Sequence, residues 1–322
     1  MLSFQPLTLE DRQWIQPLLQ QQYLDMEEYS FSFCYMWRNV HKIRAARVGD
    51  YVVFCEEFFN RRGYYFAGSG DIKPLIQTLW EDADARDEKL DLHIVTAQQR
   101  EEIERAFPGA WHLESLRDYA DYIYDRNALS TLAGKKLHGK RNHINQFIRN
   151  YPDWVYEPIA QENMDECRQL NERWYHSDDH DKEASIRSEY EAIGEAFDHY
   201  FDLGLSGGLL RVCGEVVAFA IGDPLNEDTF MVHFEKALSE YAGAYAMINR
   251  EFASNGAEGF AYINRQDDMG EDGLRKAKLS YNPVRIADKY SAVWQKECAP
   301  LASDTSHPCF AQRCCCALAS NI

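Results

Sequence analysis

One strand-like segment places a histidine next to a carboxylate. In TFMVHFE, residues 229–235, a period of two puts His233 and Glu235 on one face of the strand and Phe230 and Phe234 on the other. Histidine titrates near neutral pH, so such a pair suits a general base that takes a proton from an attacking amine. The alternative is a hydrogen-bonded polar edge beneath a loop, and both interpretations stay open.

A basic stretch occupies residues 131–150, which contain no acidic residue. Helical spacing puts Asn142 and Asn145 on a polar stripe and Arg141 within an apolar stripe, where a guanidinium needs an anionic partner. We therefore predict that Lys140 and Arg141 bind phosphate, from an RNA acceptor end or a nucleotide. The alternative is that the charges only solvate one face and that Arg141 pairs with an internal carboxylate.

A third polar group follows the strand-like run ending at Asn264. The segment INRQDDMGEDGLRKAKLS, residues 263–280, carries Asn264, Arg265, Asp267 and Asp268 at the end of a strand, where open sheets place their ligands. Asp267 and Asp268 are candidate catalytic or ammonium-binding carboxylates. Arg275 and Lys278, one helical turn apart, are candidates for binding a phosphate or carboxylate. A closed salt-bridge network would use the same residues.

The cysteines do not indicate a metal site, and we predict none. Five of the nine crowd the last 25 residues without a Cys-x-x-Cys pair or a histidine at ligand spacing. The others, Cys34, Cys55, Cys167 and Cys213, stand singly among apolar residues and predict buried free thiols.

The elements that position these residues occur in a repeated order. Two helices, three strands joined by tight turns, a helix, a strand, a helix and an extended segment occupy residues 8–125. The same order recurs over residues 155–295 at a spacing of about 164 residues, with RVGDYVVF at 47–54 matched by RVCGEVVAF at 211–219. This repetition predicts a duplicated α+β unit, with residues 127–150 forming one connecting helix.

The overall composition restricts the function. The chain has 322 residues, 45% of them hydrophobic, and a formal charge of −18, so it is globular and repels polyanions except at a local basic patch. No apolar run is long enough to span a bilayer and the first residues do not form a signal peptide, so we expect a cytoplasmic protein.

Four segments carry a family resemblance: LAGKKLHGKRNHINQF (132–147), HFEKA (233–237), GAYAMIN (243–249) and YINRQDDMGEDGLRKAKLSYNPVR (262–285). They resemble the C-terminal domain family of phosphatidylglycerol lysyltransferases, in its soluble bacterial branch, over about residues 5–295. The resemblance implies two tandem domains of the acyl-CoA N-acyltransferase (GNAT) fold, each a mixed, mostly antiparallel sheet flanked by helices. We expect an N-terminal domain at 1–126, the connecting helix at 127–150, a C-terminal domain at 151–297 and a Cys-rich tail outside the fold at 298–322.

The resemblance also implies where a coenzyme would bind. In coenzyme-A-dependent GNAT proteins the pyrophosphate rests on backbone amides at a helix N-terminus, which here follows Gly243. Their signature is Gln or Arg, two residues, Gly, one residue, then Gly or Ala, whereas this sequence has Glu240, Gly243 and Tyr245. Acyl-CoA is therefore disfavoured as a cofactor, and Gly243 is equally explained as a turn residue.

Three functions remain after these comparisons. The first is an acyl or aminoacyl transferase, using a small-molecule or aminoacyl donor such as the acceptor end of aminoacyl-tRNA, in a cleft between the domains. The second is a coenzyme-A-dependent N-acetyltransferase. The third is a non-catalytic module that binds a ligand in a degenerate cleft. The sequence favours the first.

Overall fold

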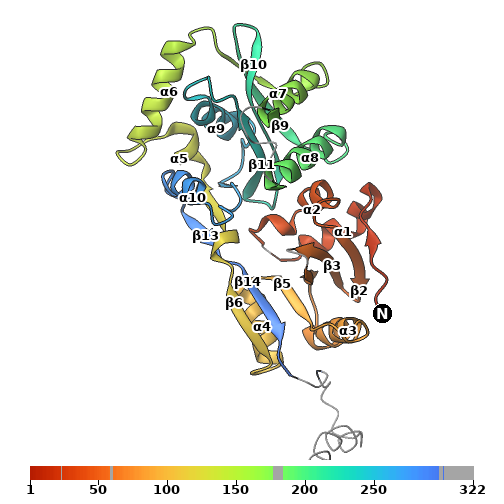
Figure 1. Cartoon of the computed structure of the whole chain (residues 1–322). Coiled ribbons are helices and arrows are strands. Elements are labelled where there is room, and N and C mark those ends of the chain that lie inside the picture. Colours follow the sequence, from red (N-terminus) through yellow and green to blue (C-terminus); the bar gives the residue numbers. More distant parts are fainter. Residues whose placement is uncertain (23, 59–60, 177–183, 297–299, 301–322) are drawn as a thin grey trace, which may run out of the picture.

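Two sheets of seven strands each organise the chain (Figure 1). The structure, a computed structural model, describes residues 1–22, 24–58, 61–176, 184–296 and 300. Both sheets are mixed and mostly antiparallel, and helices flank them. The predicted fold class, two tandem GNAT-like units, is confirmed. The predicted Cys-rich tail lies almost wholly outside the described residues.

The first sheet runs in the order β1-β2-β3-β4-β5-β14-β6, with β4 and β5 parallel. Its strands are β1 (Gln5–Pro6), β2 (Arg44–Val48), β3 (Tyr51–Phe58), β4 (Arg61–Gly68), β5 (Asp91–Val95), β14 (Tyr290–Trp294) and β6 (Trp111–Ser115).

The second sheet runs in the order β8-β9-β10-β11-β12-β7-β13, with β11 and β12 parallel. Its strands are β8 (Val155–Pro158), β9 (Ser206–Val212), β10 (Glu215–Pro224), β11 (Thr229–Ala237), β12 (Tyr262–Asn264), β7 (Asp121–Asp125) and β13 (Arg285–Ala287). Each strand therefore has a counterpart at the same place in the first sheet.

The two halves exchange one strand. β7 follows β6 in the chain but pairs with β12 and β13 of the second sheet, whereas β14 follows β13 but pairs with β5 and β6 of the first. In Figure 1, β14 (blue) lies beside β6 (yellow). The strand pairing thus assigns β7, within the predicted domain 1–126, to the second sheet and β14, within the predicted domain 151–297, to the first, because pairing is set by contacts between segments far apart in sequence.

The helices cover both faces of the sheets. They are α1 (Arg12–Leu19), α2 (Phe31–Trp37), α3 (Ile72–Asp84), α4 (Ala97–Ala106), α5 (Arg126–Thr131), α6 (His138–Asn150), α7 (Met164–His176), α8 (Ala184–Asp198), α9 (Ala244–Asn255) and α10 (Asp272–Leu279), with short 3₁₀ segments η1 (Leu9–Asp11), η2 (Glu27–Tyr29) and η3 (Arg117–Tyr119). No helix in the described ranges combines the length and the apolar character needed to cross a membrane.

The connecting segment is two helices rather than one. α5 ends at Thr131, and Leu132 then adopts a left-handed conformation with φ of 50° before α6 begins at His138. Leu132 ends α5 because a residue with left-handed backbone angles cannot continue a right-handed helix.

One hydrophobic core joins the halves. The alternation of β3 sends Val52 and Phe54 to a core that also contains α1, α2, α7, α8 and residues of β9–β11, and sends Val53 and Cys55 to a separate core under α3 and α4. A third core lies between the second sheet and α5, α6 and α9. Of the four cysteines expected to be buried, Cys213 is exposed, because it lies in the turn between β9 and β10.

We expect that residues 1–126 produced alone do not unfold cooperatively in urea, as followed by circular dichroism. The fragment lacks β14, which links β5 to β6, and loses the part of the shared core that the second half contributes. The full-length chain is the control, and a sigmoidal transition of the fragment with native-like aromatic signals would contradict this.

Candidate active site

The second sheet opens next to the predicted site residues. β11 and β12 pair only from Thr229–Tyr262 to Met231–Asn264, after which β11 continues to Ala237 while the chain leaves the sheet. The segment 265–271 and α10 then follow at the carboxyl end of β12. This confirms the predicted position of Arg265, Asp267 and Asp268 at a strand end, where parallel strands leave room for ligands.

A buried lysine lies where the exchanged strands cross. Lys289, just before β14, has no exposed side-chain surface, and its Nζ lies 2.7 Å from Asp121 Oδ1 at the start of β7 and 2.7 Å from Glu28 Oε1. Glu27 Oε1 is 3.3 Å away. The carboxylates raise the pKa of Lys289 well above its usual value although burial opposes this. Lys289 therefore stays charged and ties η2 of the first half to β7.

These carboxylates outnumber their cation. We call Glu27, Glu28, Asp121 and Asp267 the acidic cluster; all four act electrostatically on Lys289. Glu28 Oε2 is buried without a hydrogen-bond partner in the described residues, and burial raises the pKa of Glu28 to about 7. The cluster thus has spare capacity for a proton or a cationic group.

Asp267 differs from the rest of the acidic cluster. Within the described part of the chain it makes no hydrogen bond and no ion pair shorter than 4 Å, and burial raises its pKa to about 6. After Lys289, Lys278 is the basic side chain that acts most strongly on the pKa of Asp267. Burial, and then the charge of Arg265, lower the pKa of Lys278 to about 8. An acid and a base whose pKa values are both shifted toward neutral pH therefore interact electrostatically here.

Three basic side chains come from α6, from the segment after β12 and from α10. We call Lys140, Arg265 and Lys278 the basic cluster. Arg265 Nη2 donates to both oxygens of Glu235, at 3.1 and 3.3 Å. The guanidinium lies 5.0 Å from the ring centre of Tyr281, and the ammonium of Lys140 lies 3.9 Å from the same ring. Lys278 Nζ donates to the backbone oxygen of Arg265. Predicted residues from α6, β11 and α10 are thus brought together.

Asp268 and Arg275 form a closed pair away from this group. Asp268 is completely buried and accepts hydrogen bonds from Arg275, from Tyr122 at 2.5 Å and from the amide of Gly270. Burial opposes ionisation of Asp268, but the bond from Arg275 and the others lower its pKa to about 2. Arg275 also binds Asp118. For Asp268 and Arg275 the structure therefore shows a closed salt-bridge network, which the sequence analysis gave as the alternative to a ligand-binding site.

His233 and Glu235 do not form the expected pair. Ile221 pairs with Phe234 and Gly222 with Val232, so His233 is the extra residue of a β-bulge. His233 Nε2 lies 2.8 Å from Asp223 Oδ1, and Glu235 instead accepts from Asn249 and Arg265. A simple period of two fails here because a bulge shifts the alternation by one residue.

Two other predicted residues, Arg141 and Asn264, have structural contacts, and two more, Asn142 and Asn145, are exposed. Arg141 donates to the carbonyl oxygens of Leu132 and Gly134 and so caps the end of α5 without a carboxylate partner. Asn142 and Asn145 are exposed on α6. The side chain of Asn264 is buried and donates to Asp25 O at 2.6 Å and to Asp121 Oδ2 at 2.7 Å. The polar groups of Arg141 and Asn264 are thus used by contacts within the protein.

Gly243 lies under α6. It is the N-cap of α9 with φ of 91°, and a Cβ there would lie 2.6 Å from His143 O. The turn is closed from the other side by a hydrogen bond of 3.3 Å from Tyr151 Oη to Glu240 O. The start of α9 is thus packed against the protein itself.

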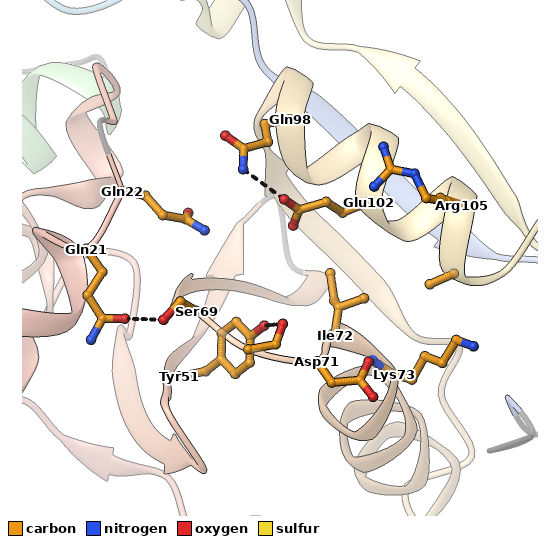
Figure 2. Close-up of a pocket in the computed structure, with 12 residues that line it drawn as sticks. Gln21, Gln22, Tyr51, Ser69, Asp71, Ile72, Lys73, Gln98, Glu102 and Arg105 are labelled. Carbon is orange, nitrogen blue, oxygen red and sulfur yellow. Dashed lines mark hydrogen bonds between the residues drawn. The ribbon is translucent and has the colours of Figure 1, made fainter.

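A cavity of about 650 Å³ lies instead in the first half, at the turn between β4 and α3 (Figure 2). Its polar groups bond each other: Ser69 binds Gln21, Gln98 binds Glu102 and Asp71 caps α3. None of the site residues predicted from the sequence lines it. Among the residues that the structure describes, no group of three or more His, Cys, Asp or Glu side chains could hold a metal ion.

Comparison with known proteins places this geometry in a family. The family described as "Phosphatidylglycerol lysyltransferase, C-terminal" matches residues 21–293, which include most of both sheets, the acidic cluster and the basic cluster. The chain belongs to this family.

Two solved structures and one curated protein are similar to this family member. A conserved protein of unknown function from Bacteroides thetaiotaomicron VPI-5482 is 40% identical with a TM-score of 0.87, over 92% of this chain and 100% of that one. The C-terminal domain of a putative lysylphosphatidylglycerol synthetase from Agrobacterium fabrum is 14% identical with a TM-score of 0.63, over 89% and 92%. The uncharacterized protein MYCGA3080 of Mycoplasmoides gallisepticum is 26% identical over 173 residues, and the match spans about half of its length, 54%.

Sequence reasoning missed the acidic cluster of this lysyltransferase-family chain apart from Asp267. Glu27 and Glu28 precede the apolar helix FSFCYMW, and Lys289 stands alone before the apolar strand YSAVW. Charges embedded in buried runs are a signal, because a buried charge must be paired. The sequence did not indicate that these charges pair with one another.

Replacing Lys289 by Met should lower the free energy of unfolding at pH 7 by about 3–5 kcal/mol, because three carboxylates lose their cation. Lowering the pH should shrink this loss, since protonation then neutralises the carboxylates. Urea denaturation measures both effects. The control, Lys42→Met, removes an exposed ion pair with Glu57 and should cost at most about 1 kcal/mol. Equal effects of the two variants would refute the role of Lys289.

Proposed function

We propose that this chain is an acyl or aminoacyl transferase and that Asp267 is its general base. The observation that carries the proposal is the state of Asp267: a half-buried carboxylate without a protein partner in the described residues, just after the end of β12, with a pKa raised to about 6. Structural carboxylates in this cleft, such as Asp268, are instead bonded and have a lowered pKa. A base poised near neutral pH is what acyl transfer to an amine requires.

The reaction would proceed by direct transfer. Asp267 takes a proton from the neutral amine or the hydroxyl of the acceptor as its nitrogen or oxygen attacks the activated carbonyl carbon of the donor. The new C–N or C–O bond forms, and the bond from that carbon to the leaving oxygen or sulfur breaks. Lys278, with a pKa of about 8, is placed to return a proton to the leaving group. Glu28 Oε2, which has no hydrogen-bond partner in the described residues, favours an acceptor or an acyl group that carries a positive charge.

Family membership supports an aminoacyl donor. The family description names a lysyltransferase, and the similar Agrobacterium fabrum domain is named a putative lysylphosphatidylglycerol synthetase. We therefore propose that the donor is an aminoacyl ester, with the acceptor end of tRNA as its carrier. The basic stretch at residues 131–150, which includes Lys135 and Lys136 just before α6, is the part of this acidic chain most suited to a polyanion.

The geometry of α9 supports the exclusion of coenzyme A from the second half. α6 packs on Gly243, and the amide of Ala244 already donates to Tyr241 O at 2.9 Å. Pyrophosphate needs free amides and room for close approach. Both are reduced here, in addition to the acidic Glu240 and the bulky Tyr245.

Replacing Asp267 by Asn should lower kcat by about 10²–10⁴-fold while ligand binding is retained. Radiolabelled lysyl-tRNA with either primary amines or phosphatidylglycerol vesicles provides the assay. Wild-type kcat/KM should rise as the pH increases through about 6, because Asp267 must lose its proton, and the variant should lack this rise.

The same substitution should not destabilise the fold at pH 7. The pKa of Asp267 is raised from 3.8 to about 6 on folding, so the charged carboxylate costs stability above pH 6 and the amide removes that cost. The matched control is Asp272→Asn, an exposed carboxylate at the start of α10. Undiminished turnover of Asp267→Asn would refute the proposed base, and turnover absent even from wild type would favour a binding module.

Acetyl-CoA should show no saturable binding in the micromolar range by calorimetry. Glu240→Gln should not restore binding, because the packing of α6 on Gly243 remains. Micromolar binding with the coenzyme resting on the amides near Gly243 would contradict this expectation.

A further inference from the structure

The residues on both sides of Asp267 are anchored, whereas its own side chain is not. Before it, the amide of Arg265 donates to Tyr122 O at 3.0 Å, and the amide of Tyr122 donates to Gln266 O at 3.1 Å. After it, the hydroxyl of Tyr122 donates to Asp268 Oδ2 at 2.5 Å. One residue of the exchanged strand β7 thus binds the chain before and after Asp267, whose carboxylate has no partner in the described residues.

Asn264 fixes the same segment from the end of β12. Its side chain is completely buried, and its Oδ1 accepts from the amide of Gln266 at 2.6 Å. Its Nδ2 donates to Asp25 O at 2.6 Å and to Asp121 Oδ2 at 2.7 Å. Because Asp25 and Asp121 belong to other parts of the fold, the direction in which the chain leaves β12 is determined before it reaches Asp267.

The backbone of Gln266 has an unfavourable conformation. Its φ is 59°, in the left-handed region that residues with a side chain rarely occupy. Such a conformation persists only where the surrounding contacts impose it, and it is found most often at functional sites. Here the contacts of Tyr122 and Asn264 impose it, directly before the unpaired carboxylate of Asp267.

Asp267 stays unpaired although two lysines act on it. Burial raises its pKa and the charges of Lys289 and Lys278 oppose this, yet neither ammonium lies within 4 Å of the carboxylate in the described residues. A carboxylate free to move would pair with one of them, and its pKa would fall. The titratable groups that act on Asp267 or feel its charge are Glu27 of η2, Tyr119 of η3, Asp121 of β7, the adjacent Asp268, Lys278 of α10 and Lys289 before β14.

We propose that Tyr122 and Asn264 are positioning residues for the carboxylate of Asp267. By holding Gln266 in its left-handed conformation, they keep that carboxylate away from the two lysines. The inference rests on the proposed function in treating Asp267 as the base, and it adds why this base stays unpaired. A carboxylate paired with a lysine accepts a proton less readily, so the positioning maintains the basicity that acyl transfer needs.

The pKa of Asp267, measured without turnover, tests the proposal. The full-length chain with isotope-labelled aspartate is titrated by NMR, and the Asp267 signal is identified by its loss in Asp267→Asn. Gln266→Val should lower this pKa so that proton binding weakens about tenfold or more, because a β-branched residue does not tolerate the left-handed conformation and the released carboxylate can pair with a lysine. Tyr122→Phe, which removes only the hydroxyl, should lower the pKa in the same direction.

Two further variants separate positioning from general damage. Gln266→Asn should keep the pKa of Asp267 near that of wild type, since asparagine tolerates a positive φ. Cys213→Val is the matched control for strain: Cys213 has φ of 49° in the turn between β9 and β10, so its replacement should lower the melting temperature and leave the pKa unchanged. Because Asn264→Ala also deprives Asp121 of a donor and can unfold the chain, Gln266→Val and Tyr122→Phe decide the question.

An unchanged pKa of Asp267 in both Gln266→Val and Tyr122→Phe would overturn the inference, as would an equal fall in Cys213→Val. In Gln266→Val the rise of kcat/KM with pH should move to lower pH together with the NMR titration. The outcome is separable from that for the base. Full turnover by Asp267→Asn would reject the proposed function, whereas loss of turnover in Asp267→Asn with an unmoved titration in Gln266→Val and Tyr122→Phe would reject the positioning alone.

Discussion

The buried ion cluster of Lys289 is the constraint on which the rest of the structure depends. Two strands must cross for β7 and β14 to exchange sheets, and Lys289 and Asp121 lie at that crossing, both with no exposed side-chain surface. Lys289 in turn holds Glu28 of η2. A buried ion pair adds little net stability but strongly disfavours any arrangement that leaves one partner unpaired. The exchange thus aligns the halves, and the shared core under α2 and α8 provides the apolar area.

The same crossing determines the electrostatics of the cleft. Carboxylates gather near Lys289, while Lys140 and Arg265 gather where β11 and β12 diverge. Lys278 is influenced by both groups: Arg265 lowers its pKa, and the carboxylates Asp267, Glu27 and Asp121 act to raise it. Because charges interact more strongly away from bulk water, each group shifts the protonation of its neighbours. If Asp267 and Lys278 had only a structural role, we would expect them to form ion pairs, as Asp268 does with Arg275.

Duplication has left the two halves unequal. The turn from β4 to α3 and the turn from β11 to α9 are equivalent in strand order, yet the first borders an open cavity and the second is packed under α6. α6 lies just before β8, whereas no helix precedes β1, the equivalent strand of the first half. Its insertion after β7 covers one turn and brings Lys140 to the cleft, so a single helix accounts for much of the asymmetry.

The sequence by itself determined the order of the elements, the duplication and the location of Asp267 and Lys278 between a strand end and a helix. These follow from periodicity and turn residues, which depend on neighbours a few positions away. Only the tertiary structure decided the strand exchange, the bulge at His233, the carbonyl partners of Arg141 and the neutralisation of Lys289. Strand partners and ion pairs depend on residues that lie from ten to more than two hundred positions away, and no local pattern records which distant group will neutralise a buried charge.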